Sequence, residues 1–163
     1  TELLNTEMRR LKVSIVSTRV HDWNSDLKPD LPASVDRILL DAPCSGLGVL
    51  RRNPDIRWRA SRQNLMAYQS RQKRLLEKMI PLLKPSGHLV YAVCSMEPEE
   101  TDEVIDFILK TYPGLIVDHD LTGFPDAGRP LIDSNGYLRT IPHRCNMDGF
   151  FAASLIKIKD DTP

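Results

Sequence analysis

The chain has 163 residues, of which 41% are hydrophobic and 27% are charged, and its formal net charge is zero. This composition is typical of one globular domain with enough apolar side chains to form a core. Because no apolar run approaches the ~18 residues of a membrane-spanning helix and the N-terminus lacks the layout of a signal peptide, we expect a cytoplasmic protein without a membrane partner.

The first forty residues predict one helix and two strands. Leucine and methionine recur at helical spacing over residues 2–10, and the mostly apolar run 13–16 indicates a short strand. A loop is expected at 24–34, which contains two prolines. The apolar run 35–40 then predicts a second strand.

A long helix and a third strand are predicted next. Ser61 fits the N-cap position of a helix, and the apolar residues that follow it indicate the helix's inner face. These residues are Leu65, Met66, Leu75, Leu76, Met79, Leu82 and Leu83. Pro81 is expected to tighten the end of the helix, and residues 84–87 to stop it just before a strand at 88–93.

The C-terminal part continues the alternation of helices and strands. A proline and three acids within residues 97–100 favour the first turn of a helix that runs to about residue 112. Further strands are expected at 115–117, 137–141 and 149–158, with a loop at 120–135. The alternation predicts an α/β fold with a mostly parallel sheet, in which the last strands form an antiparallel edge.

Two of the expected strands end in a thiol. Asp41 and Cys44 follow the strand at 35–40, and Cys94 follows the strand at 88–93. Ligands of open α/β sheets bind outside the carboxyl ends of the strands, so both sulfurs open into one cleft if these strands are parallel neighbours. Taken singly, each cysteine is more often a small buried hydrophobe, but the repeated arrangement favours nucleophilic chemistry.

The cysteine count argues against other roles for the thiols. The chain has three cysteines, at 44, 94 and 145. An odd number at such wide spacing does not form a disulfide framework, and there is no CxxC pair with matching histidines. We therefore expect reduced thiols and no metal site.

Charge is unevenly distributed along the chain. Residues 51–78 contain nine Lys or Arg against two acids, whereas residues 97–126 contain nine Asp or Glu against one lysine. A basic stripe of this kind is typical of proteins that bind nucleic acid, although a solvated amphipathic helix gives the same pattern.

Five stretches carry a family resemblance. They are residues 41–46, 53–56, 83–87 and 94–100, and 139–143 together with 147–151. In this order, and over nearly the whole chain, they resemble the successive motifs of the Sun/Fmu (RsmB-type) ribosomal RNA (cytosine-5)-methyltransferases. The resemblance implies a class I S-adenosylmethionine-dependent methyltransferase with a Rossmann-like α/β sheet, which methylates carbon 5 of a cytosine in ribosomal RNA.

The resemblance also implies a role for each reactive side chain. Cys94 would add to carbon 6 of the cytosine, which makes carbon 5 nucleophilic enough to accept a methyl group. Asp41 would hydrogen-bond the base near N3 and its exocyclic amine. Cys44 would assist removal of the carbon 5 proton and release of the enzyme. The opposite assignment of the two thiols is chemically reasonable, and only the resemblance favours Cys94.

Further residues are implied to contact the cofactor and the RNA. Asp22 matches the family's acid that contacts the adenine of S-adenosylmethionine, with a structural role as the alternative, and Asp41 and Pro43 would border the same cofactor. The residues implied to bind RNA are Arg51, Arg52, Pro54 and Asp55. Arg57, Arg59 and Arg62 are expected to assist them on the RNA backbone.

The family's glycine-rich cofactor loop and its ribose-binding acid have no counterpart in residues 1–163. We therefore expect the chain to be the C-terminal portion of a single methyltransferase catalytic domain, lacking the first two strands, inactive alone and weak in binding S-adenosylmethionine. The vacant centre of the sheet would expose an edge of strand 35–40. We expect self-association, pairing with the missing N-terminal segment, or a rearrangement that puts strand 13–16 beside strand 35–40.

Three other functions stay open at this point. The chain could be a catalytically silent RNA-binding fragment, or its enzyme could act on a cytosine of transfer RNA. An amino-group methyltransferase is disfavoured because such enzymes carry an Asp/Asn-Pro-Pro-aromatic turn after the strand, where this chain has Ala42 and Cys44.

Overall fold

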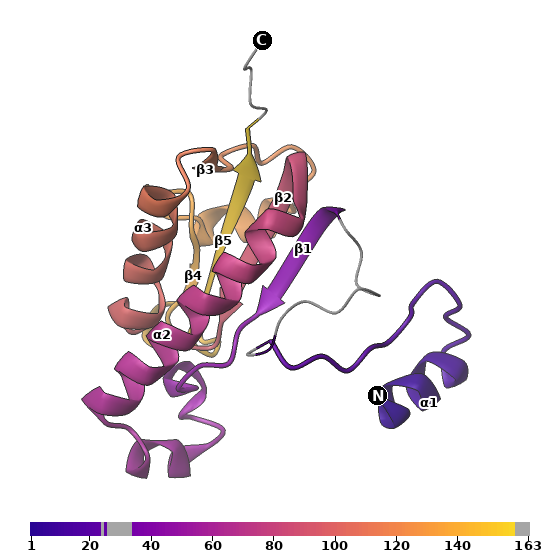
Figure 1. The fold of residues 1–163 in the computed structure, drawn as a ribbon. Coiled ribbons are helices and arrows are strands. Elements are labelled where there is room, and N and C mark those ends of the chain that lie inside the picture. The colour runs from indigo at the N-terminus through magenta and orange to yellow at the C-terminus, as the bar shows by residue number, and fades with distance from the viewer. Residues whose placement is uncertain (24, 26–33, 159–163) are drawn as a thin grey trace. The chain divides into compact units, whose positions relative to one another are not determined.

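The computed structural model describes residues 1–23, 25 and 34–158 (Figure 1). The chain divides into two compact units, Thr1–Pro32 and Ala33–Pro163. The predicted loop at 24–34 lies outside the described residues, apart from Ser25 and Ser34.

The N-terminal unit contains one helix and no strand among its described residues. Helix α1 (Glu2–Arg10) confirms the prediction for this segment, although none of its residues is buried. The predicted strand at 13–16 is wrong, because the segment has no strand conformation and 95% of Ile15 is exposed. Apolar residues form a strand only where a neighbouring strand can accept their backbone hydrogen bonds. The rearrangement that would place a strand 13–16 beside strand 35–40, one of the three expected outcomes, is therefore not seen.

The C-terminal unit is built around one mixed sheet of five described strands. These are β1 (Val35–Asp41), β2 (Leu83–Val93), β3 (Leu115–Val117), β4 (Leu138–Thr140) and β5 (Phe150–Lys157). The strand order is β1-β2-β5-β3, and β4 also pairs with β5. β1 and β2 are parallel, whereas β5 is antiparallel to all three of its neighbours.

The predicted position of the last strand is wrong, because β5 lies inside the sheet and not at its edge. β2 and β3 are both antiparallel to β5, so they run in the same direction, as expected for two strands joined by a helical crossover. β5 is inserted between them. Its neighbours therefore make the described sheet mostly antiparallel, although the α/β class of the fold is confirmed.

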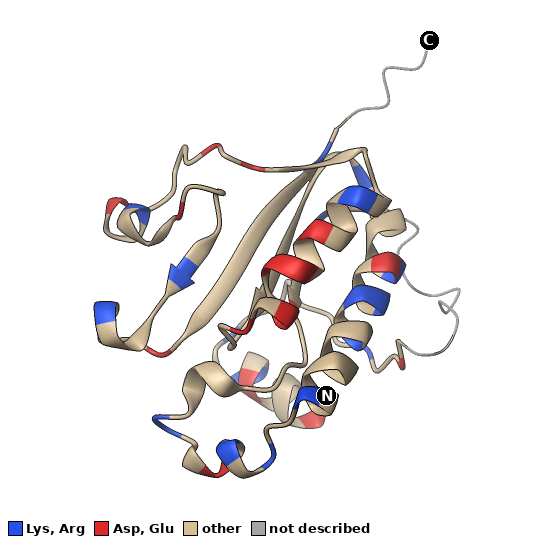
Figure 2. Ribbon diagram, turned by 90° about the vertical axis from the view of Figure 1, so that its left-hand side faces the viewer, with Lys and Arg blue, Asp and Glu red and all other residues tan. Residues whose placement is uncertain are grey.

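Two helices cover one face of this sheet (Figure 1). α2 (Arg62–Met79) begins after Ser61, whose side chain accepts a hydrogen bond from the Asn64 backbone N–H, so the predicted N-cap is confirmed. α3 (Asp102–Thr111) packs beside α2. Figure 2 shows several basic residues on α2 and on the loop before it, next to acids of α3.

The core forms where these helices meet the sheet. Leu76 of α2 and Ile105 of α3 are fully buried, as are Leu89, Tyr91, Phe151 and Leu155 of the strands. Met66 was predicted to face the core, but 45% of it is exposed. The reason is that the N-terminal end of α2 projects past the sheet (Figure 1).

Two predicted boundaries differ from the structure. Residues 84–87 do not stop the chain before a strand, because β2 already begins at Leu83 and these residues form a bulge in it. The predicted helix over 97–112 is split into the 3-10 turn Pro98–Glu100 and α3. Thr101, with φ −120° and ψ −98°, breaks the helix between them.

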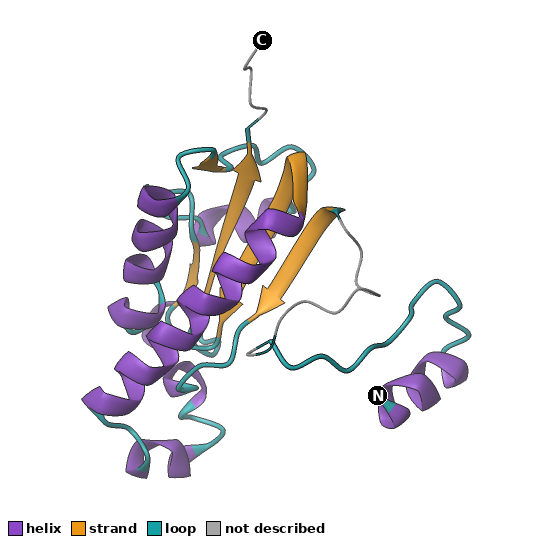
Figure 3. Ribbon diagram, in the orientation of Figure 1, coloured by secondary structure: helices purple, strands orange, loops and turns teal. Residues whose placement is uncertain are grey.

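β1 lies at one end of the described sheet (Figure 3). It pairs with β2 alone among the described strands, and 74% of its Leu39 is exposed. An exposed strand edge beside an exposed apolar side chain favours pairing with another chain segment. Self-association through β1 therefore stays a prediction. None of the described helices is both long and apolar enough to cross a bilayer.

The last two strands are separated by the short helix α4 (Pro142–Cys145), which occupies part of the stretch predicted to split them. Within the loop predicted at 120–135, residues Asp126–Leu131 form a 3-10 helix.

Candidate active site

The two strand-ending thiols meet at one edge of the sheet. β1 and β2 are parallel, and Asp41 pairs with Ala92, so both strands end at the same level. Cys44 and Cys94 follow these ends, and their Sγ atoms are 3.3 Å apart. Both are free, partly buried cysteines. This is a thiol contact at hydrogen-bond distance, well beyond the ~2.05 Å length of a disulfide bond.

The surroundings of Cys44 favour the protonated form of its thiol. Burial, followed by the hydrogen bond with Cys94 and the charge of Cys94, raises the pKa of the Cys44 thiol to about 12. Cys44 therefore keeps its proton at neutral pH and can donate a hydrogen bond to the sulfur of Cys94. Since the thiolate is the nucleophilic form of cysteine, Cys44 is poorly suited to attack a substrate.

We expect the raised pKa of Cys44 to slow its alkylation by iodoacetamide at pH 8. Cys44 should react at least about tenfold more slowly in the folded chain than in the urea-unfolded chain, because folding lowers its thiolate fraction. The rate at Cys44 should rise in the variant Cys94→Ala, which removes two of the interactions that raise its pKa. Peptide mass spectrometry gives the rate at each site. Equal rates for Cys44 in folded and unfolded protein would contradict the raised pKa.

Asp41 and Pro43 flank the thiols on the β1 side. Asp41 is the last residue of β1 and is exposed, and its carboxylate accepts no hydrogen bond within the described part of the chain. The next residue, Ala42, is buried and donates its N–H to the Ala92 carbonyl at 2.9 Å. The backbone is therefore fixed while the carboxylate is available to a bound molecule. Pro43 is partly buried, and its carbonyl accepts from the Gln72 side chain at 3.1 Å.

A buried carboxylate holds the loop that carries Cys44. Glu100 has no exposed surface, and it accepts hydrogen bonds from the backbone N–H and the hydroxyl of Ser45, at 2.8 and 2.5 Å. Gln72 of α2 donates to the same carboxylate at 3.2 Å. The Tyr91 hydroxyl donates to the Glu100 carbonyl at 2.7 Å. These contacts join the loop after β1 to the turn after β2.

Sequence reasoning missed this role of Glu100. It treated the residue as one of several acids that favour a helix N-terminus, and nothing in the local pattern separates Glu100 from Glu99. A signal was present elsewhere, because Gln72 lies on the same side of α2 as Leu76, one turn later. A polar side chain on a buried helix face needs a partner, and it indicates one across the interface.

We expect Glu100→Ala to lower the free energy of unfolding by about 2–4 kcal/mol. The substitution leaves the Ser45 N–H without its acceptor and removes one of the two acceptors of the buried Gln72 amide. Glu99→Ala is the matched control and should change stability by less than about 0.5 kcal/mol. Urea unfolding followed by circular dichroism measures both. Equal losses for the two variants would show that Glu100 does not hold the loop.

Two glycines bring a third strand end to the site. The Gly48 N–H donates to the Cys94 carbonyl at 3.0 Å, and the Gly149 N–H donates to the Gly48 carbonyl at 2.7 Å. A Cβ atom at Gly48 would lie 2.0 Å from the Gly149 carbonyl oxygen, so only glycine fits there. The start of β5 is thereby held against the loops that carry Cys44 and Cys94.

The arginines predicted to bind RNA are engaged with an acid. Arg51 and Arg52 form ion pairs with Asp148 at 3.4 and 2.7 Å, and Arg51 also donates to Asn146 at 3.1 Å. Pro54 and Asp55 begin the exposed 3-10 turn Pro54–Trp58. The role of these four residues in RNA binding stays a prediction.

The structure also describes Asp22 and Cys145. Asp22 belongs to the N-terminal unit, where its carbonyl accepts from the Ser25 backbone at 2.9 Å, and its predicted contact with the cofactor stays a prediction. Cys145 ends the short helix α4 and is partly buried. Within the described residues, no cluster of three His, Cys, Asp or Glu side chains could hold a metal ion.

Comparison with known proteins gives concordant matches. The family model of the 16S rRNA methyltransferase RsmB/F matches residues 1–156. The chain is 37% identical over 145 residues to the probable ribosomal RNA small subunit methyltransferase B of Synechocystis sp., which covers 86% of the chain and 32% of that protein. The protein of the same name from Bacillus subtilis is 34% identical over 157 residues, covering 96% of the chain and 35% of that protein.

The solved structures agree with these relatives. The crystal structure of NSun6 from Pyrococcus horikoshii with SFG matches with a TM-score of 0.80 at 30% identity, covering 98% of the chain and 39% of that structure. The chain spans about a third of the length of the curated relatives named above.

Proposed function

Because the chain belongs to the 16S rRNA methyltransferase RsmB/F family, we propose that it carries the thiol chemistry with which the full-length enzyme methylates carbon 5 of a cytosine in ribosomal RNA. The observation that supports this proposal most strongly is the 3.3 Å contact between Cys44 and Cys94 at the ends of two parallel strands. Two thiols so placed can reach the same base, where one can add to it and the other can assist the later elimination.

In the proposed reaction, Cys94 is the nucleophile. Its thiolate adds to carbon 6 of the cytosine, and the electron pair of the 5,6 double bond becomes available at carbon 5. After the methyl group is bound there, loss of the carbon 5 proton restores the double bond and expels the thiolate. The net change is replacement of that proton by a methyl group, and Cys94 is regenerated.

Asp41 binds the base in the proposed reaction, and Cys44 assists the elimination step. The exposed Asp41 carboxylate can accept a hydrogen bond from the exocyclic amine, and in its protonated form it can donate one to N3. Cys44 lies 3.3 Å from the Cys94 sulfur, so it can reach the same base. Once Cys94 is bonded to carbon 6, its charge no longer raises the pKa of Cys44. The Cys44 thiolate can then accept the carbon 5 proton while the Cys94 thiolate departs.

S-adenosylmethionine is the cofactor that the family implies, and it would supply the methyl group when bound. The residues present fit part of its site, because β1 ends in an exposed carboxylate at Asp41 followed by the partly buried Pro43. Asp22 is the further residue proposed to hold the adenine. A related structure was solved with SFG, an analogue of S-adenosylmethionine.

The proposal is tested with the full-length enzyme, an unmodified 16S ribosomal RNA transcript and S-adenosylmethionine labelled in its methyl group. The digested RNA should contain labelled 5-methylcytidine. Labelling of a transfer RNA transcript and not of the ribosomal RNA would show that the proposed substrate is wrong. A labelled nucleoside methylated on its exocyclic amine would show that carbon 5 is not the methylated atom. RNA binding without any labelling would favour a catalytically silent protein.

A further inference from the structure

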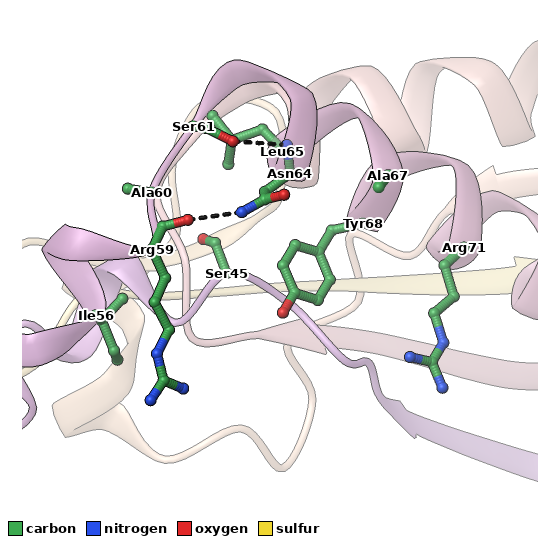
Figure 4. Close-up of a pocket in the computed structure, with 10 residues that line it drawn as sticks. All are labelled: Ser45, Ile56, Arg59, Ala60, Ser61, Asn64, Leu65, Ala67, Tyr68 and Arg71. Carbon is green, nitrogen blue, oxygen red and sulfur yellow. Dashed lines mark hydrogen bonds between the residues drawn. The ribbon is translucent and has the colours of Figure 1, made fainter.

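A pocket borders the loop that carries Cys44, with Ser45 among its lining residues. It is formed by the loop residue Ser45, by Ile56 and Arg59 of the segment before α2, and by Leu65, Tyr68 and Arg71 of α2 (Figure 4). Its volume is about 370 Å³, which lies within the ~300–1,000 Å³ range of small-ligand sites. A pocket of this size can hold a small ligand or one residue of a larger one.

The charged side chains that line this pocket are both arginines, Arg59 and Arg71. None of its lining residues is an acid. Arg59 and Arg71 are exposed, and neither guanidinium forms an ion pair with any residue that the structure describes. By contrast, Arg51 and Arg52 share the carboxylate of Asp148. Two guanidinium groups without a carboxylate partner are available to phosphate oxygens.

The centre of the pocket is aromatic. Figure 4 shows the Tyr68 ring between Arg59 and Arg71, whose guanidinium groups project to the same side as the Tyr68 hydroxyl. Tyr68 is half-buried, and the partly buried side chains of Ile56 and Leu65 add apolar surface. An aromatic ring flanked by two arginines is the arrangement on which single-stranded nucleic acids bind, with a base stacked on the ring and phosphates at the cations.

The pocket is also tied to the reactive thiols. Ser45, which lines it, directly follows Cys44, and Glu100 fixes the position of Ser45 through two hydrogen bonds. A nucleotide in the pocket would therefore lie next to a base held at Cys44 and Cys94.

We propose that this pocket binds a nucleotide that flanks the target cytosine in single-stranded RNA, with its base on Tyr68 and its phosphates at Arg59 and Arg71. The proposal rests on the proposed function, in that the target base is a cytosine held at the thiols. It assigns phosphate binding to Arg71 and base stacking to Tyr68, and it shifts the principal RNA contacts away from Arg51 and Arg52.

The first test measures binding of a fluorescein-labelled single-stranded oligoribonucleotide, with one cytosine among uridines, to the full-length enzyme. Tyr68→Ala should weaken binding about tenfold, and Tyr68→Phe should not, because phenylalanine keeps the stacking surface. Arg59→Ala and Arg71→Ala should each reduce the slope of log affinity against log salt by about 0.7. Arg74→Ala, an exposed arginine of α2 outside the pocket, is the matched control and should change neither quantity by as much.

The second test places 5-iodouridine on either side of the cytosine and maps the photocrosslinked peptide. Crosslinking to Tyr68 is expected, and its absence together with unchanged affinity of Tyr68→Ala would overturn the pocket. If that happens while the enzyme still forms 5-methylcytidine, the subsite is wrong and the proposed function stands. If Tyr68 crosslinks and its variant binds weakly but no 5-methylcytidine forms, the subsite stands and the proposed function is wrong.

Discussion

Replacing Cys94 with alanine is expected to abolish methyl transfer to RNA by the full-length enzyme, with a loss of roughly a thousandfold or more. The variant lacks the sulfur that adds to carbon 6, and without this addition carbon 5 of cytosine is a poor nucleophile. No covalent complex between protein and RNA should form. The measurement is methyl incorporation from labelled S-adenosylmethionine, together with denaturing gel electrophoresis of the reaction mixture.

The control for this loss is Cys145→Ala. Cys145 is also a partly buried free cysteine, but it lies in α4 and does not contact either of the paired thiols. Its variant should retain methyl transfer and the transient covalent complex. Activity of Cys94→Ala within a few fold of the unmodified enzyme would show that Cys94 is a structural residue and that another group attacks the base.

Cys44→Ala is expected to increase the amount of the covalent complex, whereas Cys94→Ala abolishes it. Addition and methyl transfer should proceed, because the nucleophile is intact, but elimination should be slow because the thiol beside the Cys94 sulfur is gone. A covalent protein–RNA complex that survives denaturing gels should therefore accumulate, while turnover falls.

The double variant Cys44→Ala/Cys94→Ala separates trapping from nonspecific binding. It should form no covalent complex, whereas Cys44→Ala alone should form one only when RNA and S-adenosylmethionine are both present. Loss of the complex in Cys44→Ala, together with trapping in Cys94→Ala, would exchange the roles of the two thiols.

The pairing of the thiols could be expected from the sequence because it depends on local and regular features. Two short apolar runs, each followed by cysteine and serine, are separated by one long helix. Such a unit is a right-handed crossover between parallel strands, whose carboxyl ends meet at one edge of the sheet. The parallel β1–β2 pair and the contact of Cys44 with Cys94 agree with that expectation.

The parts that could not be expected depend on contacts between distant segments. The last strand was read as an edge strand, but the register of β5 against β2 and β3 places it between them, and no local pattern encodes that choice. Likewise, Glu100 is one of several acids in sequence, and only its burial against Ser45 and Gln72 distinguishes it. The prediction of a strand at 13–16 is wrong for a related reason, because its apolar residues have no strand partner among the described residues.

The most direct test of the proposed thiol chemistry is to identify the residue that bears the nucleotide in the complex trapped by Cys44→Ala. The complex is digested with ribonuclease and protease, and the modified peptide is sequenced by mass spectrometry. The proposed mechanism predicts a 5-methylcytidine nucleotide attached to the sulfur of Cys94. Attachment to Cys145 or to a residue outside this chain, or an unmethylated base at Cys94, would contradict it.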